Sequence, residues 1–157
     1  MGLKDYEEAA GLMKEHPEMR SFVGPRDESL VRAAEETLGV ELPATYRRFL
    51  LDYGAGSFGA SEIYGVINDD FENSSVPDAV WRTLVERDEG ELPDNLVVIY
   101  EDGAGAAFCL DCADAPHGES PVVAFYVGFP PSQQPEEIIA EDFGAFLLQR
   151  VRRELTR

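Results

Sequence analysis

The chain has 157 residues, the size of one ordinary domain, and its 31 acidic residues outnumber 13 basic ones to give a formal net charge of −18. This surplus excludes nucleic acids and anionic membranes as natural partners, because binding either of them requires a basic surface. No apolar run reaches the ~20 residues of a membrane span, and the polar first residues lack the apolar stretch of a signal peptide. We therefore expect one cytoplasmic domain over residues 1–157, with two cysteines that fit a reducing compartment.

Helical spacing of apolar residues predicts two helices near the start of the chain. The first covers residues 3–15 and ends before Pro17. The second begins near Asp27 or Ser29, since either residue can cap a helix. It ends at Gly39, which readily adopts the left-handed conformation that closes many helices.

A third predicted helix precedes the string Gly54-x-Gly56-x-x-Gly59, which matches the glycine fingerprint of a dinucleotide-binding loop. Such a loop must follow a strand and open a helix, so that the helix N-terminus faces the pyrophosphate. Here the glycines instead follow a helix that begins at Pro43, and the surrounding chain is acidic. The apolar face of that helix consists of Tyr46, Phe49, Leu50 and Tyr53. We interpret the glycines as a helix cap and a tight turn into a sheet, and we expect no nucleotide cofactor.

The rest of the chain predicts short strands followed by a closing helix. Strands are expected at 62–67, 96–101, 106–111, 120–128 and, more briefly, 136–140. A helix over 77–87 is expected to direct Val80, Trp81, Leu84 and Val85 inward, and the closing helix has Phe143, Phe146, Leu147 and Val151 on one face. The pattern predicts an α+β fold with a mainly antiparallel sheet of about four to six strands and helices at both ends of the chain packed on it.

The residues that most often carry chemistry form no recognisable catalytic or metal site. Cys109 and Cys112 make a CxxC pair, but residues three apart on a strand face opposite sides, and a structural zinc site needs four ligands. Neighbouring acidic residues would also raise the pKa of both thiols. His117 lies in a predicted loop and is interpreted as a solvated residue. We therefore expect no catalytic residue, no metal ligand and no cofactor.

The negative charge is concentrated in residues 62–119, which contain 15 acidic residues and, as bases, only Arg82 and Arg87. One interpretation is a solvated face that keeps the protein soluble. The other is a surface that attracts a basic partner. A small metal- or carboxylate-dependent hydrolase is a third possibility, although the acidic residues do not follow the spacing of an EF-hand calcium loop.

The order of motifs resembles the SUKH superfamily, which includes the yeast cell-wall synthesis regulator and many bacterial proteins. The residues that carry the resemblance at its start are Glu35, Leu38-Gly39, Leu42-Pro43, Tyr46, Phe49-Leu50, Gly54 and Gly56. The later segments "EIYGV", "LPDNLVVIYEDGAGAAFCLD", "SPVVAFYVG" and "EDFGAFLLQRV" follow in the family's order. The resemblance covers about residues 28–151, leaving 1–20 as an extra N-terminal helix. It departs from the family where Ala55 separates two glycines that are often adjacent.

The resemblance implies a non-catalytic α+β domain that binds another protein. Bacterial proteins of this kind are mostly immunity proteins, which bind and block a cognate toxin that is often a nuclease. A nuclease must present a basic surface, so the acidic stretch would serve to bind it. The residues expected to contact the partner are Glu62, Asp69, Asp70, Glu72, Glu101 and Asp102. The alternative that the yeast relative suggests is a regulatory scaffold with a host partner.

Overall fold

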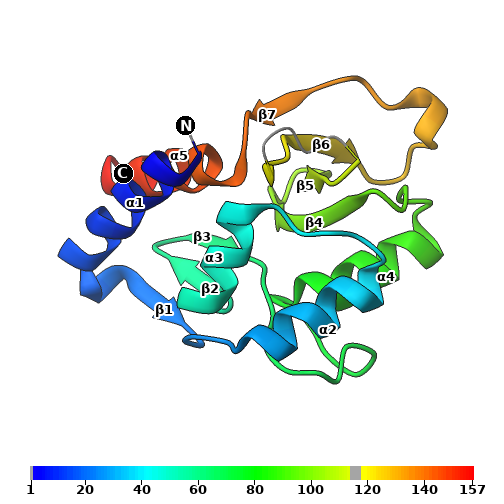
Figure 1. Ribbon diagram of the computed structural model, residues 1–157. Coiled ribbons are helices and arrows are strands. Elements are labelled where there is room, and N and C mark those ends of the chain that lie inside the picture. The colour runs from blue at the N-terminus through cyan, green and yellow to red at the C-terminus, as the bar shows by residue number, and fades with distance from the viewer. Residues whose placement is uncertain (1, 114–117) are drawn as a thin grey trace.

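The computed structural model describes residues 2–113 and 118–157 and has the predicted α+β fold, with helices at both ends of the chain (Figure 1). The helices are α1 (Gly2–Glu15), α2 (Glu28–Leu38), α3 (Ala44–Asp52), α4 (Ala79–Glu89) and α5 (Phe143–Leu155), with short 3-10 turns η1 (Pro17–Met19) and η3 (Pro131–Gln133). The strands are β1 (Arg20–Phe22), β2 (Gly56–Phe58), β3 (Ser61–Ile63), β4 (Leu96–Glu101), β5 (Ala106–Asp111), β6 (Val122–Tyr126) and β7 (Ile138–Ala140).

The strands form two antiparallel sheets. The larger has the order β4-β5-β6-β7, so strands consecutive in sequence are neighbours, as the hairpin pattern predicted. In the register of this sheet, Val97 on β4 lies opposite Leu110 on β5, and Leu110 lies opposite Val122 on β6. The smaller sheet has the order β1-β2-β3. The two sheets meet where the backbone N–H of Tyr64 donates to the carbonyl of Ile99 at 2.8 Å.

The main core lies between one face of the larger sheet and helices α1, α3 and α5. Figure 1 shows α1 and α5 side by side at one end of the molecule. The ring of Phe143 on α5 lies 5.0 Å from that of Tyr46 and 5.3 Å from that of Phe49, both on α3. The apolar stripes predicted on α3 and α5 therefore face each other, and aromatic contacts of this kind add to the stabilisation from burial alone.

Helix α4 covers strand β4 on the opposite face of the larger sheet, but with a different inward face from the predicted one. The buried residues of α4 are Ala79, Val80, Thr83 and Glu86, whereas Trp81, Leu84 and Val85 are only half-buried. Leu84 still packs against the main core as predicted, but the prediction that Trp81 and Val85 point inward is wrong because polar contacts fix the rotation of the helix. Thr83 Oγ1 accepts the backbone N–H of Val98 at 2.9 Å, and Asp78 caps the first turn.

The glycines of the 54–59 string allow β2 to pass close to β1. Both are short strands that the sequence did not predict. Gly54 and Gly56 have φ of 75° and 144°, which side chains disfavour. A Cβ on Gly54 would lie 2.5 Å from the carbonyl oxygen of Gly24, and one on Gly56 would lie 2.1 Å from that of Ser21. The interpretation of these glycines as a cap and a turn is confirmed for Gly54, which follows α3, and for Gly59, in the turn after β2, whereas Gly56 lies within β2 itself.

We expect Gly56→Ala to lower the free energy of unfolding by at least about 2 kcal/mol, because the added methyl group meets backbone atoms that cannot move aside. Gly11→Ala is the matched control. Gly11 lies within α1, where an added methyl group would meet no atom within 4 Å, so alanine there should raise stability by about 0.5–1 kcal/mol. Urea denaturation measures both changes, and equal effects of the two variants would contradict this explanation.

Candidate functional site

Arg87, near the end of α4, joins this helix to the end of α2. Its Nη1 donates to the carbonyl oxygen of Leu38 at 2.8 Å, and its Nη2 donates to that of Asp94 at 2.7 Å. Burial lowers the pKa of Arg87. Figure 1 shows α2 and α4 side by side, and this contact fixes their C-terminal ends together with the loop that leads into β4.

Exposed carboxylates surround this junction, and we call them the helix-end cluster. Its members are Glu36, Glu41, Asp88, Glu89, Glu91 and Asp94. Within residues 2–113 and 118–157, no salt bridge reaches any of them. The last carbonyls of a helix form the negative end of its dipole, so a carboxylate there is destabilising by about 0.3–1 kcal/mol. Glu36, Asp88 and Glu89 lie in the last turns of α2 and α4, where selection for stability alone would favour lysine or arginine.

Arg82, the other arginine of the acidic stretch, forms ion pairs with Glu86 and Glu101. Its Nε and Nη2 donate to the two carboxylate oxygens of Glu101 at 2.9 and 3.1 Å, and Nη2 also lies 2.8 Å from Glu86. The hydroxyl of Tyr64 donates to the same Glu101 at 2.9 Å. The hydrogen bond with Glu101 raises the pKa of Arg82, and burial raises that of Tyr64. Neither arginine of the stretch forms a salt bridge with the helix-end cluster, although Arg87 interacts electrostatically with Asp94.

Three of the six residues expected to contact a partner lie together in the loop between β3 and α4. Asp69, Asp70 and Glu72 are all exposed. Asp70 accepts a hydrogen bond from the side chain of Asn73 at 3.2 Å, and Asp69 lies beside the N-terminal end of α2 at Asp27. This loop is thus at the opposite end of α2 from the helix-end cluster.

The other three expected residues lie on the strands or directly after them. Glu62 is exposed on β3, whereas the carboxylate of Glu101 is held by Arg82 and Tyr64 as described. Asp102 accepts the backbone N–H groups of Ala104 and Ala106 at 2.7 and 3.1 Å and so shapes the β4–β5 turn. Among the described residues, no hydrogen bond or salt bridge joins these three to the 69–72 loop.

Sequence reasoning did not select the helix-end cluster. The signal that could have found it is "ERDEGELPD", an acidic run at the predicted end of a helix, where basic residues are usual. Glu36 and Glu41 lie outside the acidic stretch and join the cluster only because α2 and α4 pack together.

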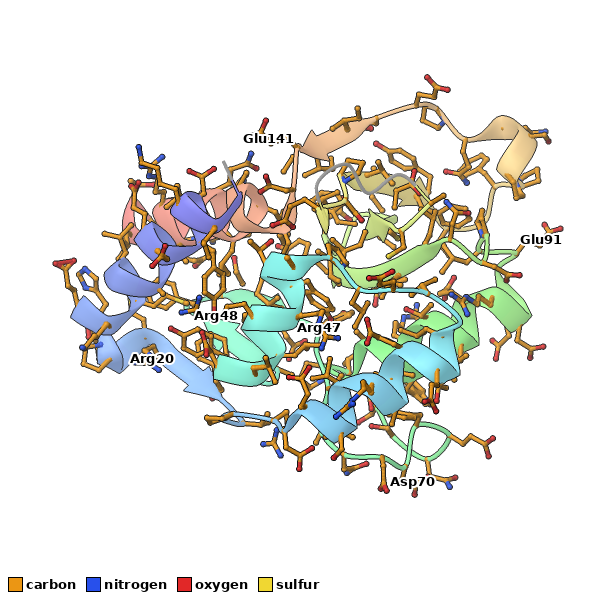
Figure 2. All side chains as sticks on the ribbon, viewed as in Figure 1. Arg20, Arg47, Arg48, Asp70, Glu91 and Glu141 are labelled. Atoms are coloured by element: carbon orange, nitrogen blue, oxygen red, sulfur yellow. The ribbon has the colours of Figure 1, made fainter. Side chains whose placement is uncertain are left out.

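Most of the basic residues lie on the other side of the molecule, where acidic residues accompany them. The basic residues on α1, β1, α3 and α5 that are distant from the cluster are Lys4, Lys14, Arg20, Arg48, Arg150, Arg152 and Arg153, with Arg157 just after α5. Figure 2 shows Arg20 and Arg48 on the α1 side and Asp70 and Glu91 on the opposite side. The α1 side therefore carries charges of both signs, several of them in salt bridges, whereas among the described residues no salt bridge reaches the helix-end cluster.

The two cysteines lie on opposite faces of the larger sheet, as the strand spacing predicted. Cys109 is buried in the core beneath α4, and Cys112 packs against the main core. Burial raises the pKa of both thiols, that of Cys112 to about 12, so both are protonated at neutral pH. His117 lies outside the described residues. Within those described, no group of three or more His, Cys, Asp or Glu side chains is arranged to hold a metal ion, and no helix is long and apolar enough to cross a membrane.

These elements, in this order, define an α+β domain of the SUKH kind. The model of the SUKH_5 family, described as SMI1-KNR4 cell-wall, matches residues 3–152. The chain therefore belongs to the SUKH_5 family. The match includes nearly all of α1, whereas the motifs quoted from the sequence begin at about residue 28. The family is generally non-catalytic and associated with protein partners, and membership supports an immunity protein or a regulator of the SMI1-KNR4 kind.

We expect Glu36→Gln and Glu89→Gln each to raise the free energy of unfolding by about 0.3–1 kcal/mol at low ionic strength, because each removes a negative charge from the negative end of a helix dipole. Urea denaturation measures the gain, which should disappear in about 1 M NaCl. Glu7→Gln, at an exposed position in the N-terminal half of α1, is the control and should give no gain. A loss of stability in both helix-end variants would contradict this account.

Proposed function

We propose that this protein is an immunity protein that neutralises a cognate bacterial toxin by binding it through its acidic surface. The observation that carries the proposal is the helix-end cluster, whose carboxylates form no salt bridge among the described residues and of which Glu36, Asp88 and Glu89 lie where helix dipoles disfavour them. A charge pattern that lowers the stability of the free protein is expected where that charge is needed for binding. Membership of the SUKH_5 family supports the same function.

A basic toxin fits this surface on electrostatic grounds. Opposite charges on two proteins steer their encounter and raise the association rate, most strongly at low salt. A nuclease must present cationic groups to the phosphate backbone of its substrate, so a protein that covers those groups also blocks the substrate. The inhibitor then acts by stoichiometric occupation and needs no chemical step of its own.

The contact surface in this proposal centres on the helix-end cluster and includes the loop carboxylates Asp69, Asp70 and Glu72, which are exposed and have no cationic partner among the described residues. Glu62 on β3 is exposed but is not part of this surface. The carboxylates of Glu101 and Asp102 are already engaged, by Arg82 and by the backbone of the β4–β5 turn, and are not part of this surface.

A regulatory protein of the cell-wall type is the second candidate, and the description of the matching family favours it. It would use the same surface for a host protein. The genomic neighbourhood separates the two functions, because an immunity gene lies beside the gene of its toxin and a regulator gene has no such neighbour.

We expect the double variant Glu36→Lys/Glu89→Lys to lose protection when co-expressed with the toxin encoded beside its gene. Its association rate with the purified toxin, measured by stopped-flow fluorescence at low salt, should fall about tenfold or more because electrostatic steering is lost.

Glu7→Lys/Glu15→Lys is the matched control, with the same change of net charge on exposed positions of α1. It should retain protection and most of the association rate. Full protection by the helix-end variant, or equal loss in both variants, would refute binding through the helix ends.

A further inference from the structure

An apolar groove crosses the larger sheet on the same face as α4, over the part that α4 leaves uncovered. Its volume is about 460 Å³, within the range of ligand-binding pockets. The floor includes Val123 and Phe125 of β6 and Leu96 of β4, and the walls include Pro93 on one side and Ile138 on the other. Val123 and Ile138 are cross-strand neighbours, which places their side chains on the same face.

The segment between β6 and β7 holds the groove open. It stands away from the sheet in Figure 1 and includes three prolines, at positions 130, 131 and 135, which restrict its backbone. The side chain of Gln134 fixes it to β6 and the turn that follows. Its Oε1 accepts the backbone N–H of Tyr126 at 2.7 Å, and its Nε2 donates to the carbonyls of Tyr126 and Phe129 at 2.7 and 2.9 Å. The groove is therefore preformed and needs no rearrangement before binding.

Two features make this groove unusual for a free surface. Ile138 is 70% exposed at its wall, the most exposed of the large apolar residues described. All titratable side chains among the described residues of its lining are acidic, namely Asp111, Glu136 and Glu137. An apolar floor within an acidic rim matches a partner that presents an apolar side chain between cationic ones.

The groove also adjoins the helix-end cluster. The loop from α4 to β4 contributes Glu91 and Asp94 to the cluster and Pro93 to the groove wall. Protein interfaces commonly combine a small, well-packed apolar centre with a polar rim, and most of the binding energy comes from the centre. The groove can supply that centre, and the carboxylates the rim.

We propose that the groove receives a bulky apolar residue of the basic partner, flanked in the partner's sequence by lysine or arginine. This inference rests on the proposed function for the basic character of the partner. The inference adds that affinity and specificity come from this one apolar residue of the partner, while the helix-end cluster mainly raises the rate at which the two proteins associate.

The test uses two fluorescein-labelled heptapeptides that differ at one position, with either phenylalanine or alanine between two pairs of lysines. Fluorescence anisotropy measures the binding of each to the full chain at physiological ionic strength. We expect the phenylalanine peptide to bind about fivefold or more tightly than the alanine peptide, because burial of the ring adds a hydrophobic contribution. Ile138→Lys should reduce this ratio to about one by placing a cation in the groove.

Leu3→Lys is the matched control, since Leu3 is an exposed leucine on α1 and the change of charge is the same. It should keep the ratio of the wild-type protein. Ile138→Ser provides a second test should the lysine variant fail to fold, and it should lower the ratio without adding charge. Glu36→Lys/Glu89→Lys should weaken both peptides equally and leave the ratio unchanged, which separates the anchor from the charge cluster.

Equal affinity of the two peptides for the wild-type protein would overturn the proposal, as would a ratio that survives in Ile138→Lys. A dimer in analytical ultracentrifugation that Ile138→Lys dissociates would also overturn it, because the groove would then serve a second copy of this chain. Failure to neutralise a toxin would contradict the proposed function but would leave the peptide ratio unchanged.

Discussion

The arrangement of the proposed binding surface depends on the hydrogen bonds of Arg87. One guanidinium binds the carbonyl of Leu38 at the end of α2 and that of Asp94 in the loop before β4. These bonds bring two helix C-termini together and fix the loop that contributes to both the carboxylate cluster and the apolar groove. Because its donors are directed to backbone carbonyls, Arg87 organises the acidic surface without forming a salt bridge to it, and it interacts electrostatically with Asp94.

Much of the fold could be predicted because its elements have clear local signals. The stripe from Tyr46 to Tyr53 and the hairpin from residue 96 to residue 111 follow helical and strand periodicity, and both occur as predicted. Strands β1 and β2 were missed because each has three residues of which only the phenylalanine is apolar, whereas the equally short β3 and β7 contain isoleucines and adjoin or include further apolar residues. The rotation of α4 was missed because buried polar groups, Thr83 and Glu86, fix it and hydrophobic spacing does not.

The site was harder to predict because a sequence shows where acidic residues are but not which of their carboxylates are left without an ion pair or hydrogen bond in the folded protein. Glu101 and Asp102 lie in the most acidic stretch, yet their carboxylates are held by Arg82 and by the backbone of a turn. Glu36 lies far from that stretch in sequence but joins Glu89 through the packing of α2 on α4. The dipole of each helix, and the contact between the helices, exist only in the folded chain.

Carboxylate labelling with carbodiimide and glycine ethyl ester, read by mass spectrometry on the free protein and on its complex with the neighbouring toxin, tests the central claim most directly. The account predicts that Glu36, Asp88 and Glu89 react readily in the free protein and are protected in the complex. Glu7 and Glu15 on α1 should react equally in both. Protection of the α1 carboxylates, with the helix ends still reactive, would show that the partner binds elsewhere and contradict the account.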